Sequence, residues 1–326
     1  MTAPANPGPA GDEENLMSTP DGGLGATLEP PTVDDDLDRP GNRVRPEDPD
    51  GLDALFAEQY PDQVPATAGE ARAEYLPRRE YVAVRHKLVQ NRDGEQRGAL
   101  LGVLVGARQF RALLLYLLLL AGEPLLQHNR WLPLRTVAHM LTTASYGCTV
   151  GQARQAIAAL VRLNLVVVRE RGMSVELWPL LEDGSGQRWT PPTGEDEDPE
   201  LQRYFAVPHA LFTDEVLDRL HMPGLAVMLV CLKETSKTSV FSVPVDRFTA
   251  YYGFSERTAE RGYGELVDAG LLRVHRQLIR DSRSARGLRG KFHRALLGPF
   301  STQARRDAQR RAQEKRIGAA VKERSS

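Results

Sequence analysis

The sequence has little cysteine, few aromatic residues and no long apolar segment. Its 326 residues include only two cysteines, Cys148 and Cys231, which excludes a disulfide-rich secreted scaffold and a four-cysteine zinc site. The longest apolar run, Ala112 to Ala121, is much shorter than the ~20 residues that a membrane helix needs. The first residues lack the basic and apolar parts of a signal peptide. These absences predict a cytoplasmic protein with no membrane partner.

The common catalytic and cofactor-binding motifs are also missing. The sequence has no Gly-x-x-x-x-Gly-Lys-Ser/Thr phosphate loop. Its seven histidines form no His-x-His or His-x-x-x-His pair of the kind that binds a metal. The acidic run Glu195–Asp198 has the surroundings of a linker, so we expect it to be solvated. We therefore expect no catalytic residue, no metal, no cofactor and no enzyme activity.

Charges of opposite sign are separated along the chain. Residues 1–70 carry 16 acidic and 3 basic side chains, whereas residues 71–326 carry 27 acidic and 39 basic ones. The first 70 residues also hold 11 of the 22 prolines and eight glycines. Such a segment buries too little apolar surface to offset the entropy of ordering it. We predict a disordered acidic arm over residues 1–75.

One short segment of this arm has an apolar pattern. Leu52, Leu55, Phe56 and Tyr60 fall at helical spacing among acidic residues. One interpretation is a chance cluster in a disordered arm. The other is a short helix over residues 52–60 that docks on a protein partner.

A second change in composition divides the rest of the chain. Residues 182–200 contain seven acidic residues, three prolines and three glycines, which is typical of a linker. The sequence therefore predicts a first domain over 76–181, an acidic linker over 182–200, a second domain over 201–300 and a basic tail over 301–326, helical or disordered.

An internal repeat relates the two domains. Residues 81–88 match residues 204–211 at five of eight positions, among them a shared histidine, His86 and His209, which we expect to be structural. Residues 146–168 align without a gap to 252–274 with seven identities. These blocks occur in the same order in both domains. The chain thus carries one module twice, and we name residues 76–181 copy one and residues 201–300 copy two.

The module reads as a mainly α fold with a small β-hairpin (α+β). Each copy has a short strand, a long apolar helix, a short helix, a Tyr-Gly turn and a capped helix, which begins at Thr149 or Ser255. The capped helix should stop at Asn164 or Gly270, the residue types that best adopt a left-handed conformation. Strands predicted to follow are 165–169 and 175–180 in copy one, and 271–274 and 291–297 in copy two. On the second capped helix, Ala259, Leu266 and Val267 should face the core.

This order of elements resembles the winged helix-turn-helix modules of plasmid replication initiators and phage-type replisome organisers. The resemblance rests on Val207-Pro208, on the turn Ser255-Glu256-Arg257-Thr258 and on Leu266–Leu271, with the pattern L-x-x-x-G-L. It implies two tandem winged helix-turn-helix domains over residues 81–300 and a double-stranded DNA partner. Copy one fits less well, because Val150 and Gly151 occupy outward positions of its capped helix.

Copy two supplies the residues that such a DNA reader needs. Donors near the start of a recognition helix can reach base edges, and a basic wing can neutralise phosphates. The predicted recognition-helix contacts are Ser255, Glu256, Arg257, Thr258, Glu260 and Arg261. The wing, expected to be a flexible loop over residues 277–289, supplies Arg280, Arg283, Arg286 and Arg289, followed by Lys291.

Copy one and the tail offer weaker candidates. The domain 1 candidates for DNA contact are Thr149, Gln152, Arg154, Gln155, Arg169 and Arg171. Copy one is either a second DNA reader or a dimerisation module, in which part of Leu113–Leu120 faces another subunit. The tail carries eight basic and three acidic residues, and it is either a solvated helix or a source of extra phosphate affinity.

These features predict a sequence-specific double-stranded DNA-binding protein of the nucleoid, with a role as an origin-binding replication or plasmid-maintenance factor. A transcriptional repressor is the first alternative, because it would need the same groove contacts. A non-catalytic adaptor that uses its modules to bind protein is the second.

Overall fold

The computed structural model describes residues 66–77, 80–91, 97–126, 131–192, 199–284 and 286–324. The segment 52–60 and most of the predicted arm lie outside the described residues. The predicted arm boundary at residue 75 is wrong, because Ala68–Glu74 forms helix α2, whose first turn has a capping box between Thr67 and Glu70. The buried Arg72 anchors this helix by donating to the carbonyl oxygens of Met140, Thr142 and Phe212.

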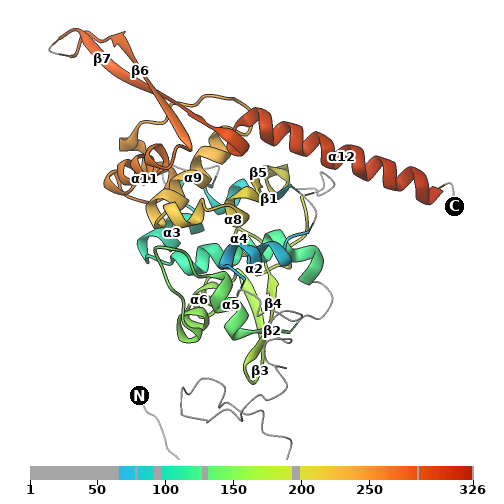
Figure 1. Ribbon diagram of the computed structural model, residues 1–326. Coiled ribbons are helices and arrows are strands. Elements are labelled where there is room, and N and C mark those ends of the chain that lie inside the picture. Colours follow the sequence, from blue (N-terminus) through green and yellow to red (C-terminus); the bar gives the residue numbers. More distant parts are fainter. Residues whose placement is uncertain are drawn as a thin grey trace, which may run out of the picture. The chain divides into compact units, whose positions relative to one another are not determined.

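The elements predicted for copy one are present in the expected order, together with η2 and α3, which were not predicted (Figure 1). Their bounds are β1 (Tyr81–Arg85), η2 (His86–Leu88), α3 (Leu100–Gly106), α4 (Phe110–Leu126), β2 (Leu132–Pro133), α5 (Leu134–Met140), α6 (Val150–Arg162), β3 (Val166–Arg171) and β4 (Ser174–Pro179).

Copy two repeats this order with longer hairpin strands. Its elements are α7 (Pro199–Gln202), β5 (Tyr204–Pro208), α8 (Ala210–Thr213), η3 (Leu217–Arg219), α9 (Met222–Glu234), η4 (Val245–Arg247), α10 (Phe248–Tyr252), α11 (Glu256–Asp268), β6 (Leu272–Arg280) and β7 (Leu288–Leu296). The chain continues through η5 (Gly298–Phe300) into α12 (Thr302–Arg324). The protein therefore mixes helices with small antiparallel sheets, of order β1-β5, β2-β4-β3 and β6-β7.

The ends of the two capped helices match the sequence prediction. Thr149 accepts from the Gln152 backbone N–H at 3.2 Å, and the Gln152 side chain accepts from the Thr149 backbone N–H at 2.9 Å. Ser255 caps α11 by accepting from the Thr258 backbone N–H at 3.3 Å. The helices stop at Asn164 and Gly270, which have φ values of 52° and 71°. Residues at the helix ends thus determine where both helices begin and stop.

Helices α4 and α9 form the centre of the two copies. No side chain from Leu113 to Leu120 is more than 7% exposed. The alternative in which this stretch faces another subunit is therefore wrong, because the chain itself covers it. On α11, Ala259 and Leu266 are buried as expected, but Val267 is 45% exposed and does not face the core.

Strands β1 and β5 pair antiparallel and so join the two copies. Ala83 lies opposite Ala206, Tyr81 opposite Pro208 and Arg85 opposite Tyr204. Tyr81 and Tyr204 occupy the same repeat position, and so do Ala83 and Ala206. The pairing is therefore unchanged when the copies are exchanged, which is the property of a local two-fold axis through the two alanines.

Each Tyr-Gly turn also contacts the other copy, although the two contacts differ in kind. The Ala144 backbone N–H in copy one donates to the Asp218 carboxylate in copy two at 2.6 Å. Ala250, which has the same place before its own turn, accepts from the Arg97 backbone N–H of copy one at 2.7 Å. A Cβ atom added to Gly98 would lie 2.8 Å from the Gly253 Cα atom. The backbones of the two copies thus meet too closely there for any side chain.

The expected linker is partly wrong. Glu182 is fully buried and accepts from the backbone N–H and the guanidinium of Arg85 at 3.0 and 3.2 Å, and from the Trp189 indole at 3.2 Å. Arg85 also donates to the carbonyl oxygens of Thr190 and Leu201 at 2.9 and 2.7 Å. Its composition resembles a linker, but the segment 182–192 is anchored to the core by the buried Glu182 and Trp189, although most of its other residues are exposed. Residues 193–198 lie outside the described part of the chain, and residues 64–326 form one compact unit.

Glu182→Gln should lower the free energy of unfolding by about 3–5 kcal/mol, because it leaves the Arg85 charge buried without a counter-charge. The measurement is equilibrium denaturation by urea. Asp183→Asn is the matched control: its side chain is exposed and an asparagine oxygen can still accept from the Ser185 N–H, so the change should stay within about 0.5 kcal/mol. A loss below about 1 kcal/mol for Glu182→Gln would mean that the two carbonyl contacts alone satisfy Arg85.

Candidate nucleic-acid interface

Four of the six residues predicted to contact DNA lie on the exposed face of α11, and Ser255 is the residue that caps it. Glu256, Arg257, Glu260 and Arg261 are exposed, whereas Thr258 is half-buried. The Ser255 and Thr258 hydroxyl groups lie 2.9 Å apart and are engaged in the helix cap. They are therefore less available for base contacts than the sequence suggested.

The two arginines of this face differ in their surroundings. Arg261 lies 3.5 Å from the Glu265 carboxylate. Glu265 itself accepts from the backbone N–H groups of His221 and Gly224, at 2.9 and 3.0 Å, at the start of α9. Arg257 makes no side-chain hydrogen bond or ion pair with any residue that the structure describes. Arg257 is thus the cation of α11 that can reach a ligand without breaking a contact.

The wing is a hairpin of two nine-residue strands rather than the flexible loop expected over residues 277–289. The ladder continues to the pair Arg280–Leu288. The tip is closed by a hydrogen bond from the Asp281 N–H to the Gly287 oxygen at 2.9 Å and by one from the Ser284 hydroxyl to the Leu288 oxygen at 2.8 Å. Along one face of the hairpin, apolar residues alternate with arginine or glycine at every second position, a strand pattern that the spacing of the arginines concealed.

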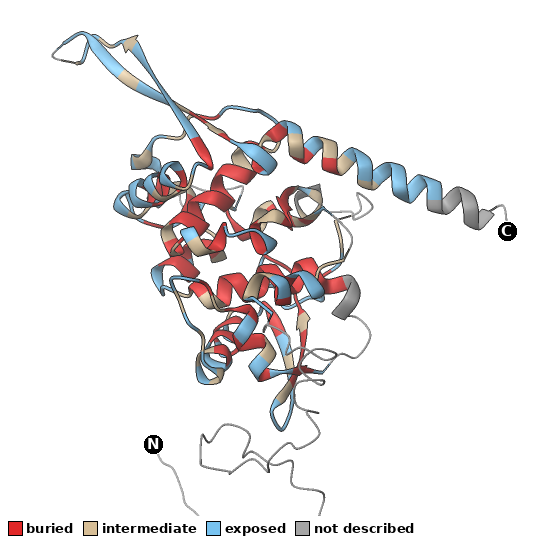
Figure 2. Cartoon of the chain, in the orientation of Figure 1, coloured by how far each residue is buried: buried red, intermediate tan, exposed pale blue. Residues whose placement is uncertain are grey.

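The hairpin is exposed along most of its length (Figure 2), and in Figure 1 it extends beyond the helices of copy two. Because side chains alternate between the two sides of a strand, the register separates two faces. One face carries Val274, Leu278, Leu288 and Phe292, exposed by 41, 57, 45 and 43%, together with Arg276 and Arg280. The opposite face carries Arg273, His275, Gln277, Ile279, Arg289, Lys291 and His293.

The predicted wing cations are therefore distributed over the whole hairpin. Arg280 lies on the apolar face, Arg289 and Lys291 lie on the opposite face, and Arg283 and Arg286 are in the tip. Arg289 lies 3.6 Å from the Asp281 carboxylate. All five side chains are exposed. Sequence reasoning identified these cations but missed the apolar face, although the alternation Val274-x-Arg276-x-Leu278-x-Arg280 signals it.

Copy one has fewer available donors. The Thr149 and Gln152 side chains cap their own helix, so their predicted DNA contact would compete with the cap. Arg154, Gln155 and Arg171 are exposed. Arg169 lies over the Trp178 ring at 4.6 Å and 3.9 Å from Glu176. Because a two-residue turn joins β3 to β4, this wing is also much shorter than that of copy two.

The tail is helical, and its basic residues have different roles. Arg305 is buried and donates to the carbonyl oxygens of Leu232, Thr235 and Phe300, so it is not available for phosphate. Arg311 forms an ion pair with Glu80. Residues 313–318 are exposed, which leaves this part of α12 accessible to a ligand.

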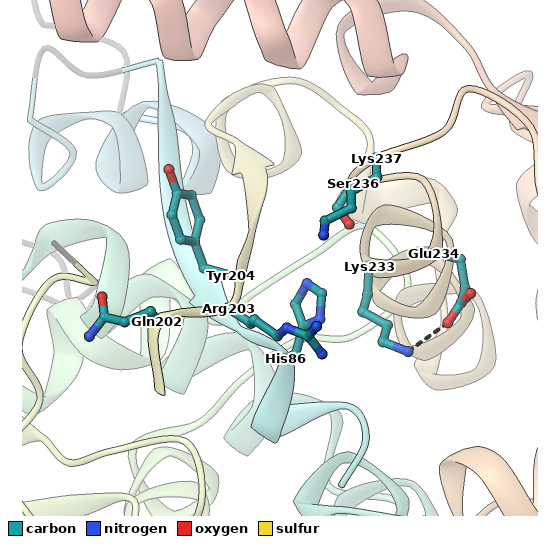
Figure 3. Close-up of a pocket in the computed structure, with 8 residues that line it drawn as sticks. All are labelled: His86, Gln202, Arg203, Tyr204, Lys233, Glu234, Ser236 and Lys237. Carbon is teal, nitrogen blue, oxygen red and sulfur yellow. Dashed lines mark hydrogen bonds and ion pairs between the residues drawn. The ribbon is translucent and has the colours of Figure 1, made fainter. Parts of the chain in front are cut away.

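Sequence reasoning missed a cavity of about 500 Å³ where the two copies meet (Figure 3). We name it the junction cavity. It is lined by His86, Gln202, Arg203, Tyr204, Lys233, Glu234, Ser236 and Lys237. Burial, together with the charges of Lys233 and Arg203, lowers the pKa of His86 to about 4. The prediction that His86 is structural holds in part, since its ring lies 5.9 Å from that of Phe205, but its surroundings are also positively charged.

Comparisons with known proteins add no relative. No family model, curated protein or solved structure matches the chain. Among the described residues, no group of three or more His, Cys, Asp or Glu side chains is arranged to hold a metal ion. None of the described helices is both long and apolar enough to span a membrane.

The pKa of His86 gives a prediction for the dependence of stability on pH. Since folding lowers this pKa to about 4, from an ordinary value of about 6.5, the fold favours the neutral imidazole. That contribution is fully present above pH 6.5 and is lost as the pH falls towards 4. It amounts to about 3 kcal/mol at most.

The measurement is urea denaturation of wild type and His86→Gln at several pH values between 7 and 4. The variant should lose less stability on acidification, because glutamine does not titrate. His275→Gln, which replaces an imidazole exposed to solvent, is the control and should follow wild type. Equal slopes for wild type and His86→Gln would contradict the assignment.

Proposed function

We propose that the protein is a non-catalytic, sequence-specific double-stranded DNA-binding protein built from two tandem winged helix-turn-helix modules. One observation carries this proposal: the two exposed arginines of α11 are followed directly by an exposed hairpin that carries seven further cations outside the core. These are Arg273, Arg276, Arg280, Arg283, Arg286, Arg289 and Lys291. A donor-bearing helix next to a basic ribbon can read a groove and neutralise the phosphates beside it.

The two-fold pairing of the copies suggests how the half-sites of the DNA target are arranged. Helices α6 and α11 occupy the same position in their copies, and the copies are joined by the two-fold pairing of β1 with β5. Two reading helices related in this way favour a target with two inverted half-sites. Copy two has the larger set of available cations, so its half-site should contribute more of the specificity.

The resemblance to plasmid replication initiators and replisome organisers supports a role at a replication origin or in plasmid maintenance. A repressor would need the same contacts, so DNA binding itself is tested first. In a gel shift at two salt concentrations, DNA from around the gene should bind more tightly than random DNA and more weakly at high salt. Repeated short sequences beside the gene, bound in preference to its promoter, would favour the origin role.

The apolar face of the hairpin favours a second candidate, the protein adaptor. Four large apolar side chains exposed on one ribbon are unusual for a surface that meets only phosphates, and such patches commonly bind protein. If this role is correct, Leu278→Ser and Phe292→Ser should abolish capture of the partner and leave any DNA affinity unchanged.

Arg257→Ala should weaken binding to the specific site by about 1–3 kcal/mol and leave nonspecific binding nearly unchanged. The reason is that Arg257 is exposed near the helix start without a competing contact. Arg261→Ala should also weaken binding to the specific site, but by a smaller amount, because the Arg261 side chain is paired with Glu265. Fluorescence anisotropy with specific and random duplexes measures both effects. Arg188→Ala, which removes an exposed arginine elsewhere, is the matched control. Equal loss on random DNA would restrict Arg257 to phosphate contact.

Replacing Arg280, Arg283, Arg286 and Arg289 together by alanine should reduce the log–log salt slope of DNA binding by about two to four units. The melting temperature should hardly change, because no core contact is lost. Replacing Val274, Leu278, Leu288 and Phe292 by serine changes the same hairpin without changing its charge, so the slope should persist. An unchanged slope in the folded arginine variant would remove the hairpin from the DNA interface.

A further inference from the structure

The junction cavity is built from both copies of the module. His86 follows strand β1 in copy one, whereas the other seven lining residues come from the start of β5 and the end of α9 in copy two. In Figure 3 the His86 ring and the Arg203 side chain lie next to each other, and Lys237 and Ser236 approach from the end of α9. A ligand held there would contact the two copies at once.

The lining of this cavity is positively charged. Arg203, Lys233 and Lys237 contribute three cations, and Glu234 contributes one carboxylate. Glu234 is already engaged, because its Oε1 atom accepts from the Lys233 ammonium at 2.6 Å and from the Tyr252 hydroxyl at 2.9 Å. The formal charge of the lining is therefore +2 with a neutral imidazole. The effect of Lys233 and Arg203 on the pKa of His86 has the sign expected for such a field.

The cavity also presents polar groups suited to oxygen atoms. The Nε2 atom of His86 is buried and has no hydrogen-bond partner among the described residues. Buried polar atoms are normally satisfied, and a shift of the lining would be needed for a ligand to reach this one, because less than 1 Å² of its surface is accessible. Ser236, Tyr204 and Gln202 complete the lining. Cations combined with neutral donors match the several oxygens and the double charge of a phosphate group.

We propose that the junction cavity binds the phosphate group of a small anionic ligand, held between His86 of copy one and Arg203 and Lys237 of copy two. Its volume of about 500 Å³ lies within the range of small-molecule sites, so a mononucleotide is tested as well as inorganic phosphate. By contacting both copies, the ligand stabilises the arrangement in which they are joined. This proposal does not depend on DNA binding.

The test uses the full-length chain at constant ionic strength and at pH 7. Inorganic phosphate and adenosine monophosphate are titrated while the imidazole signals are followed by NMR, with His86→Gln identifying the His86 signal. The expected result is a saturable shift of that signal. Lys237→Ala and Arg203→Ala should each weaken binding about tenfold, the loss of one charge-assisted hydrogen bond. Both side chains are exposed, so the fold should survive. Arg188→Ala, an exposed arginine outside the cavity, should bind as wild type does.

Two outcomes would overturn the proposal. The first is a shift that does not saturate or that is unchanged in Lys237→Ala. The second concerns the source of the phosphate, since a DNA backbone offers the same chemistry. If a short duplex without terminal phosphates shifts the His86 signal and the two free ligands do not, the cavity belongs to the DNA interface. That result would support the proposed function, so the failures of the two proposals are distinguishable.

Discussion

The pairing of β1 with β5 is the constraint on which the remaining arrangement depends. Two five-residue strands meet about the Ala83–Ala206 pair, and this single register determines which surfaces of the copies face each other. It brings the Tyr-Gly turn of copy two against the segment before the long helix of copy one, where Gly98 and Gly253 leave no room for side chains. A shift of one residue would turn the buried Val84 and Val207 side chains to the opposite face.

Buried arginines reinforce this junction, and they explain why a count of basic residues misleads. Arg72, Arg85 and Arg305 are 1, 1 and 3% exposed, and each donates to main-chain carbonyl oxygens of segments distant in sequence. A guanidinium has several donors in a fixed plane, so it can satisfy several carbonyl groups at once where helices end. These three cations hold the chain together, and the positive charge available to a ligand resides mainly in the hairpin and in the exposed part of α12.

The sequence predicted the elements whose signals are local. The caps at Thr149 and Ser255, the stops at Asn164 and Gly270, and the order of helices and strands in both copies follow from residue types at short spacing. Features that depend on distant partners were missed. Composition made residues 182–192 a linker because nothing nearby shows that Glu182 meets Arg85. The sequence also failed to predict helix α2, which Arg72 anchors, the exposure of Val267, and the junction cavity, whose lining comes from three separate segments. The predicted hairpin strands were too short, because arginines that recur at intervals of three conceal the alternation of side chains between the two faces of a strand.

Duplication followed by divergence gives the two copies unequal capacities. In copy one the cap consumes Gln152, a stacked Trp178 restrains Arg169, and the wing turns after two residues. In copy two the cap engages Ser255 and Thr258 but neither arginine of α11, and nine-residue strands carry cations far from the core. The long ribbon is possible because Leu272 and Leu296 fix its base in the core, while cross-strand pairs maintain the rest in solvent. A two-stranded ribbon exposed on both faces is marginally stable in water, so a ligand that covers it gains affinity and also stabilises it. The hairpin is therefore the least packed part of copy two, and its stability is the one that ligand binding would increase most.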